Sequence, residues 1–243
     1  MKQHCLPMPG KFKHRSSKAE MMDAPFIGKE ILFQNLHELD ILNRTLGGHA
    51  ITLSGIKKLV TDKNKIYHIV DLGCGSGDSL KRIAIWARSH EFKVRLTGID
   101  LNGDAINYLE NHCRDYPEIS GKMIDWQEYL KDKNTIDIIH CSLFCHHLHD
   151  DELTNLFNMI RSQAMTGFVI NDLRRSWLAY YSVILFTRLL NGSILSKNDG
   201  PISVLRGFKS SEIIDFMRNA QIKEYTIQRK WAFRFLIIGF KVE

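Results

Sequence analysis

Short apolar runs alternate with amphipathic segments from residue 66 onward. The apolar runs have the length and β-branched content of buried strands, and the segments between them repeat their apolar residues every three or four positions. Such alternation implies right-handed crossovers and a parallel sheet that is covered on both faces. The pattern predicts strands at 66–72, 93–100, 121–125, 136–142 and 167–173, and helices at 78–89, 103–115 and 150–160.

The pattern changes at both ends of this region. Leucines recur at 32, 36, 39, 42 and 46, and Gly47-Gly48 follows, which predicts an amphipathic helix that ends there. Residues 223–231 and 233–242 are two strand-like stretches with no helix between them, so we expect an antiparallel hairpin at one edge of the sheet. The predicted fold class is α/β, a doubly wound, mostly parallel seven-stranded sheet with an antiparallel C-terminal hairpin and helical cap elements.

Residues 177–190 are too apolar for an ordinary surface helix and carry one charge, that of Arg188. Three readings are open: a helix buried against the sheet, a cap with aromatic walls over a pocket, or a contact with a membrane surface. No apolar run reaches the roughly 20 residues of a membrane span. We predict a basic, mobile leader over 1–20 and a single domain over 21–243, with an N-terminal helical cap (21–62) and an inserted cap helix (175–195).

Composition and charge limit the kinds of partner and the cellular compartment that the sequence predicts. The five cysteines are odd in number and never spaced as CxxC, so they predict neither a disulfide framework nor a zinc site, and a reducing cytoplasm is the simplest compartment. The formal charge of +6 lies partly in the leader and is otherwise interspersed with acids. This dispersed pattern makes a nucleic-acid partner unlikely and leaves a homodimer open.

A glycine-rich loop follows the first predicted strand in the sequence VDLGCGSGD, residues 70–78. The glycines at 73, 75 and 77 give G-x-G-x-G, whereas dinucleotide sites use G-x-G-x-x-G, and the third glycine of that pattern falls here on Asp78. A carboxylate beside a pyrophosphate is unfavourable. Asp71 and Asp78 on either side of the loop therefore favour a ligand with positive charge.

The loop and the strand ends that follow it resemble the motifs of class I S-adenosylmethionine-dependent methyltransferases, in the expected order over residues 66–172. The resemblance implies a Rossmann-like fold that binds S-adenosylmethionine. In that family an acid after the second strand binds the ribose hydroxyls, here Asp100, and an acid and its neighbour after the third strand contact the adenine, here Asp125 and Trp126. The cofactor-binding residues implied in this way are Arg44, Asp71, Gly73, Cys74, Gly75, Ser76, Gly77, Asp100, Leu101, Asp125, Trp126 and Ser142.

The loop after the fourth strand, Ser142 to His147, bears on the reaction. It lacks the Asn/Asp-Pro-Pro-aromatic motif of adenine amino methyltransferases and the acid that metal-dependent catechol methyltransferases place there, so we expect no metal. A neutral imidazole can accept the proton of a phenol, so His146 and His147 are the candidate catalytic bases, with His146 favoured. The alternative is that this pair only packs structurally.

The methyl acceptor is suggested by a weaker resemblance, to ubiquinone and menaquinone methyltransferases and to those acting on aromatic polyketides. It implies O-methylation, or C-methylation, of a phenolic or polyketide-derived small molecule in secondary metabolite biosynthesis. An RNA substrate, or a cofactor-binding assembly partner without activity, are the alternatives. The candidate substrate-binding residues are Asn171, Arg174, Trp177 and Tyr181.

Overall fold

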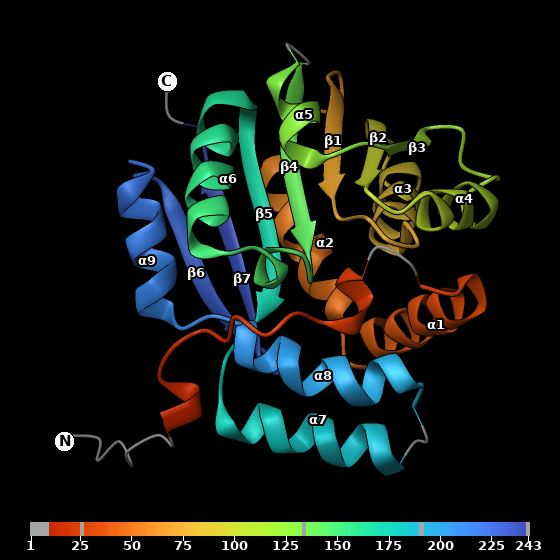
Figure 1. Cartoon of the computed structure of the whole chain (residues 1–243). Helices are drawn as coiled ribbons and strands as arrows, with labels where there is room; N and C mark the ends of the chain where they lie inside the picture. The colour runs from red at the N-terminus through yellow and green to blue at the C-terminus, as the bar shows by residue number, and fades with distance from the viewer. Residues whose placement is uncertain (1–9, 25–26, 133–134, 190–191, 242–243) are drawn as a thin grey trace.

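Seven strands form one sheet in the order β3-β2-β1-β4-β5-β7-β6 in the computed structural model, which describes residues 10–24, 27–132, 135–189 and 192–241 (Figure 1). The first five strands are parallel, and β7 runs antiparallel to both β5 and β6. The predicted mostly parallel, Rossmann-like sheet with its C-terminal hairpin is therefore confirmed. The strands are β1 (Ile66–Leu72), β2 (Lys93–Asp100), β3 (Ile119–Met123), β4 (Ile136–Ser142), β5 (Ala164–Leu173), β6 (Tyr225–Lys230) and β7 (Arg234–Phe240).

Two apolar layers cover the sheet. On one face α2 (Gly48–Leu59), α3 (Asp78–Ser89) and α4 (Gly103–His112) share a buried cluster with the strands. On the other face α5 (Trp126–Lys131), α6 (Asp150–Gln163) and α9 (Ser210–Asn219) share a second cluster. β1 and β4 contribute apolar side chains to both clusters, as expected for strands buried on both faces, although each also carries buried polar residues such as Asp71 and His140.

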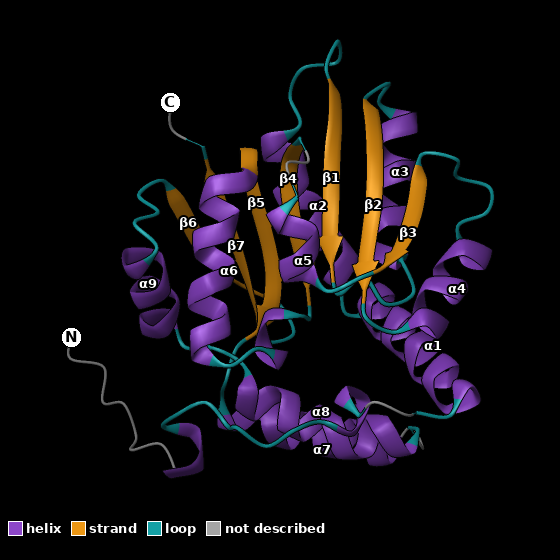
Figure 2. Ribbon diagram, turned by 45° about the horizontal axis from the view of Figure 1, so that its top comes forward, coloured by secondary structure: helices purple, strands orange, loops and turns teal. Residues whose placement is uncertain are grey.

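The carboxyl edge of the parallel strands is covered by α1 (Lys29–Thr45), α8 (Ile194–Arg206) and α7 (Trp177–Leu189), with α7 outermost (Figures 1 and 2). Glu38 joins α1 to the start of α8, because its carboxylate accepts hydrogen bonds from the backbone N–H of Ser193 and from the hydroxyls of Ser193 and Ser196. Among the described residues, no helix is long and apolar enough to cross a bilayer. Ligands of parallel α/β sheets bind at this edge, so these helices surround the candidate site.

Several elements differ from the sequence prediction. The N-terminal cap contains two helices, because Gly47 adopts the left-handed conformation (φ 76°) and turns the chain from α1 into α2. Helix α8 was not predicted separately, because Gly200-Pro201 is typical of a turn, yet Pro201 lies inside the helix. Helix α9 was also not predicted separately, and β3 lies at 119–123 rather than 121–125.

The part of the predicted leader that the structure describes, residues 10–20, lies against the domain instead of apart from it. It begins with the short 3-10 turn η1 (Gly10–Phe12), in which Phe12 is fully buried. The backbone N–H of Ser16 donates to the carbonyl of Leu205 on α8 (3.1 Å). A second 3-10 turn, η2 (Met21–Asp23), follows the leader and packs on α8. Residues 1–9 lie outside the described part.

Candidate functional site

The glycine-rich loop connects β1 to α3 at the carboxyl edge. Gly73, Gly75 and Gly77 have φ values of 67°, 50° and 74°, a region in which residues with a Cβ are strained. The loop backbone is held by β2, because the N–H groups of Gly73 and Cys74 donate to the carbonyl of Ile99 (2.8 and 3.0 Å). A Cβ on Gly73 would overlap the ring of Phe144, and one on Gly75 would lie 3.2 Å from the side chain of Leu36.

Asp100 holds the loop from the end of β2. One carboxylate oxygen accepts the N–H of Gly75 (3.0 Å) and the other accepts the N–H of Asn102 (2.9 Å). Burial raises the pKa of Asp100; the two backbone hydrogen bonds oppose that rise, and the charge of Asp71 adds to it. The ionised carboxylate is therefore held at a free-energy cost, which a cationic ligand nearby would reduce.

Asp71 lies beneath the loop in a buried polar network. Its carboxylate accepts a hydrogen bond from Nδ1 of His140 (2.7 Å), and Nε2 of His140 faces the hydroxyl of Thr52 on α2 (3.4 Å). The amide of Asn171 donates to that hydroxyl (3.0 Å) and to the carbonyl of Gly48 (2.9 Å). Asp71 is 2% exposed and Asn171 is 0% exposed. The role of Asn171 in orienting substrate stays a prediction, and the contacts seen here give it another role, because its amide is buried and joins α2 to β5.

The other predicted cofactor residues are distributed around the same edge. Asp125 accepts hydrogen bonds from the N–H groups of Gln127 (2.8 Å) and Glu128 (3.3 Å) and so caps α5. Trp126 is 6% exposed and belongs to the core cluster beneath α5. Contact of these two residues with an adenine ring stays a prediction. Of the remaining four, Leu101 is 69% exposed, Cys74 and Ser76 are buried, and Ser142 is half-buried at the end of β4.

The acid after the loop, Asp78, is already paired. It accepts hydrogen bonds from the hydroxyl of Ser76 and lies 3.0 Å from Nε2 of His112. Burial opposes ionisation of this carboxyl, but the bonds from His112 and Ser76 outweigh it and lower the pKa of Asp78. Asp78 is therefore already hydrogen-bonded within the domain.

The paired histidines lie in the 3-10 turn η3 (Cys145–His147), directly after β4. His146 is 3% exposed, its Nδ1 lies 2.7 Å from the buried carboxylate of Asp172, and its Nε2 lies 3.7 Å from Oε1 of Glu20. The side chain of His147 is 20% exposed, and its Nδ1 lies 2.7 Å from Asp23. Both rings are thus oriented by carboxylates, and His147 is the more accessible of the two.

The pKa of His147 is raised above its ordinary value of 6.5, because the hydrogen bond to Asp23 and the charges of Glu20, Asp23 and Asp172 outweigh the opposing effect of burial. Burial likewise opposes ionisation of Asp23, but its bond to His147 lowers its pKa below 3.8. The contribution of His147 to stability is complete below pH 6.5 and is lost as the pH rises through the raised value. That of Asp23 is present above pH 3.8 and is lost as the pH falls through the lowered value.

Two arginines attach the leader to this turn. Arg15 donates to the carbonyls of His146 (3.2 Å) and Leu148 (2.9 Å) and pairs with Asp150 (2.6 Å). Arg206, in the last turn of α8, donates to the carbonyls of His146 (2.9 Å), His147 and Lys18 (3.0 Å). We call residues 15–23 the strap. Sequence reasoning missed the contribution of the strap, because no local pattern connects Glu20 or Asp23 with a turn more than 120 residues away.

Glu20, His146 and His147 are the only described group whose ligand atoms lie close enough together, within 4.8 Å, to hold a metal ion. However, Nε of Arg206 lies 3.7 Å from Oε1 of Glu20, and each imidazole already has a carboxylate at 2.7 Å. A permanent cation therefore already accompanies the carboxylate. We interpret the group as an ion-pair cluster, and the expectation of a metal-free enzyme stays a prediction.

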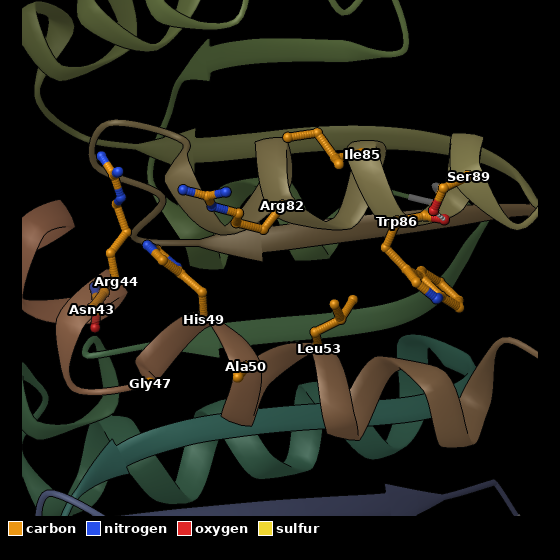
Figure 3. A pocket seen from close by; sticks show the side chains of 10 residues that line it. All are labelled: Asn43, Arg44, Gly47, His49, Ala50, Leu53, Arg82, Ile85, Trp86 and Ser89. Atoms are coloured by element: carbon orange, nitrogen blue, oxygen red, sulfur yellow. Dashed lines mark hydrogen bonds between the residues drawn. The ribbon is translucent and has the colours of Figure 1, made fainter.

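Arg44 lies in the last turn of α1. Its guanidinium is 3.6 Å from Asp40, and it lines an open groove of about 540 Å³ between α2 and α3 (Figure 3). Figure 3 shows Arg44, Arg82 and His49 at one end of this groove and Trp86 at the other. The predicted contact of Arg44 with the methionine carboxylate stays a prediction, and nothing in the groove supports it.

The remaining predicted substrate residues lie at the start of α7. The guanidinium of Arg174 is 5.6 Å from the ring centre of Phe233, and burial lowers the pKa of Arg174 with help from the charge of Arg229. Trp177 and Tyr181 are 51% and 52% exposed, on the side of α7 that faces away from α8. They do not form a closed aromatic wall around the glycine loop.

The comparisons with known proteins are in agreement about the fold. Residues 69–166 match a family model described as a methyltransferase domain. No curated protein sequence matches the chain. Among solved structures, human N-acetylserotonin methyltransferase in complex with SAM superposes with a TM-score of 0.62 at 14% identity, over 89% of this chain and 57% of that one.

Two further structures have a similar fold. The plantazolicin methyltransferase BpumL in complex with SAH has a TM-score of 0.66 at 14% identity, over 88% of this chain and 94% of that one. An O-methyltransferase described as putative, from Nostoc punctiforme PCC 73102, has a TM-score of 0.57 at 11% identity, over 85% of this chain and 60% of that one. The chain thus spans about three fifths of the length of the human and Nostoc proteins.

Proposed function

We propose an acceptor and a catalytic base on the premise that this chain is a class I S-adenosylmethionine-dependent methyltransferase, which its methyltransferase-domain match over residues 69–166 and its fold support. The proposed reaction is methyl transfer to the hydroxyl of a small aromatic, phenolic or polyketide-derived molecule. The observation that carries the proposal is His147, an accessible imidazole held by a carboxylate at the carboxyl edge of the sheet.

The residues at this edge fit S-adenosylmethionine better than a dinucleotide. The glycines at 73, 75 and 77 let the backbone approach a ligand closely, and a Cβ at 73 would meet the Phe144 ring. Asp100, whose pKa burial raises, favours a ligand with positive charge and disfavours a pyrophosphate. When bound, the cofactor supplies an electrophilic methyl group on its sulfonium sulfur.

His147 is the better base of the pair. Both ring nitrogens of His146 face buried carboxylates, and the ring is 3% exposed, so it has no nitrogen directed at a substrate. In His147 the bond from Nδ1 to Asp23 leaves Nε2 to accept the proton of the acceptor hydroxyl as the methyl group is transferred. Because the pKa of His147 is raised, turnover should increase as the pH rises through that value.

Neighbouring folds leave both the acceptor and the methylated atom open. Human N-acetylserotonin methyltransferase and the Nostoc protein described as an O-methyltransferase share the fold, but so do the methyltransferase domain of citrinin polyketide synthase and the carbon methyltransferase CurJ. O-methylation is proposed because a base with a raised pKa suits removal of a hydroxyl proton. The NMR chemical shift of the transferred methyl group distinguishes O- from C-methylation.

The test is turnover of a panel of phenols with S-adenosylmethionine, followed by mass spectrometry, for wild type, His147→Ala and His149→Ala. His149 is an exposed histidine two positions further on and serves as the matched control. We expect loss of at least about 100-fold in kcat for His147→Ala and little change for His149→Ala. Equal turnover in the two variants would rule out His147 as the base, and salt-sensitive turnover of RNA alone would move the substrate to nucleic acid.

A further inference from the structure

Helix α7 presents an apolar stripe to solvent. Six apolar side chains on the side opposite α8 are each about half exposed or more, and Leu189 is the most exposed at 70%. With 100° per residue they occupy about half of the helix circumference, whereas Ala179 on the opposite side is buried and Val183 lies against Gly200 of α8. The stripe consists of Trp177, Leu178, Tyr181, Leu185, Phe186 and Leu189.

The two chain segments next to the stripe contain basic residues and no acids of their own. Residues 1–19 and 173–198 contain no Asp or Glu, but they contain five and four Lys and Arg residues respectively. The described parts of these two stretches pack together: Nζ of Lys11 lies 3.9 Å from the ring centre of Tyr180, Phe12 contacts the same ring, and Arg175 donates to the carbonyl of Phe12 (3.2 Å). The apolar stripe therefore has a basic border formed by the leader and by Arg188.

We infer that the outer face of α7, together with η1, docks on an anionic lipid surface. A helix that lies in the interface of a membrane combines Trp, Phe and Leu on one side with Lys and Arg at the border, and it needs no bilayer-spanning length. Trp177 and Tyr181 at one end of the stripe are the amphipathic ring types that are enriched at the level of lipid headgroups. This inference concerns a surface and does not rest on the proposed reaction.

A second copy of the chain fits the stripe less well. The 13-residue helix α7 is roughly 20 Å long, and one face of it is small beside the about 800 Å² per partner of a stable interface. A twofold contact through α7 would also bring two identical basic borders together, with no acid in 173–198 to compensate them. An anionic lipid surface complements both the apolar stripe and its border.

The experiment is sedimentation of the full chain with vesicles of phosphatidylcholine alone or with 30% phosphatidylglycerol. Each Lys or Arg near such a surface contributes roughly fivefold to binding, so we expect the anionic vesicles to bind tighter by a factor on the order of 10 to 100. The fluorescence of Trp177 should shift to shorter wavelength on binding, and this shift should be missing in Trp177→Phe.

Two pairs of variants separate the apolar and the charged contributions. Leu185→Glu/Leu189→Glu should weaken binding by at least about tenfold, whereas Met165→Glu, an equally exposed apolar residue at the other edge of the sheet, should leave it unchanged. Lys11→Glu should weaken binding to anionic vesicles roughly fivefold or more. Lys93→Glu makes the same change in net charge at the opposite edge of the sheet and should leave binding to anionic vesicles unchanged.

Circular dichroism and thermal unfolding verify that each variant is folded. No binding to either vesicle type overturns the inference, and so does binding that Leu185→Glu/Leu189→Glu leaves intact, because adsorption would then depend on charge alone. A dimer in sedimentation equilibrium that this double variant dissociates, without vesicle binding, also overturns it and assigns the stripe to a second copy.

Discussion

Asp100 supports the glycine loop, and we predict that it also binds the cofactor; matched substitutions can separate the two functions. In Asp100→Ala the N–H groups of Gly75 and Asn102 lose their acceptor. An unsatisfied buried N–H costs about 1–3 kcal/mol. Both groups are only partly buried, and removal of a carboxylate with a raised pKa is itself favourable. We therefore expect a loss of about 2–3 kcal/mol in the free energy of unfolding without any ligand.

Asn102→Ala is the matched control for Asp100→Ala. The side chain of Asn102 also accepts two backbone N–H groups, from Asp104 and Ala105, but it caps α4 and does not touch the loop. Its removal should cost about 1 kcal/mol of stability and leave cofactor affinity unchanged. Asp100→Ala should in addition weaken binding of S-adenosylmethionine by about 1–3 kcal/mol, roughly 5- to 150-fold.

Urea unfolding followed by tryptophan fluorescence gives the stabilities, and isothermal titration calorimetry gives the affinities. Wild-type stability in Asp100→Ala would mean that the carboxylate does not support the loop. Equal losses of affinity in the two variants would mean that the general loss of stability, and not a direct contact of Asp100 with the cofactor, weakens binding.

Three further outcomes are expected. Gly75→Val should abolish the thermal stabilisation that S-adenosylhomocysteine gives to the wild type, because a branched residue is strained at φ 50°. The control Gly10→Val has open space around the new side chain and should retain this stabilisation. Asp23→Asn should reduce stability mainly between the ordinary pKa values of 3.8 and 6.5, where the wild type has both Asp23 and His147 charged, and a pH-independent loss would contradict the ion pair. Thr52→Val should cost about 1–3 kcal/mol in urea unfolding by removing the shared hydroxyl from the buried network; an unchanged midpoint would show that the network does not need it.

The elements best predicted from sequence are those with a strong local signal. The ranges of β1, α3, β2 and β4 agree with the prediction at every boundary, because apolar runs and the glycine loop delimit them. Helix α8 was not predicted, because Gly200-Pro201 locally prefers a turn. In the structure, packing of α8 against α7 and η2 overrides that preference. Local pattern is thus sufficient for the sheet and insufficient for the cap.

The candidate site shows the same difference between residues with a local sequence signal and residues defined by distant contacts. The glycines and Asp100 were found because they form a motif within consecutive strands. The burial of Asn171 depends on Gly48 and Thr52, more than 115 residues earlier in the chain, and the carboxylate partner of His147 lies 124 residues away. No spacing rule reports such contacts, and for that reason sequence reasoning favoured His146 and did not consider Asp23.

The strap has a consequence for the order of folding. Its first residues leave the ribosome before any of their partners, since Arg15 binds the carbonyl of Arg206 and Glu20 binds the hydroxyl of Ser203, 191 and 183 residues later. Closing loops of this length is entropically costly, so the strap should be fixed only after the sheet and α8 have formed. A segment that is added last can also detach first, without unfolding the sheet. Hydrogen exchange should therefore show residues 15–23 opening independently of β1 and β4, and with them the carboxylate of Asp23 leaving His147 while the sheet stays folded.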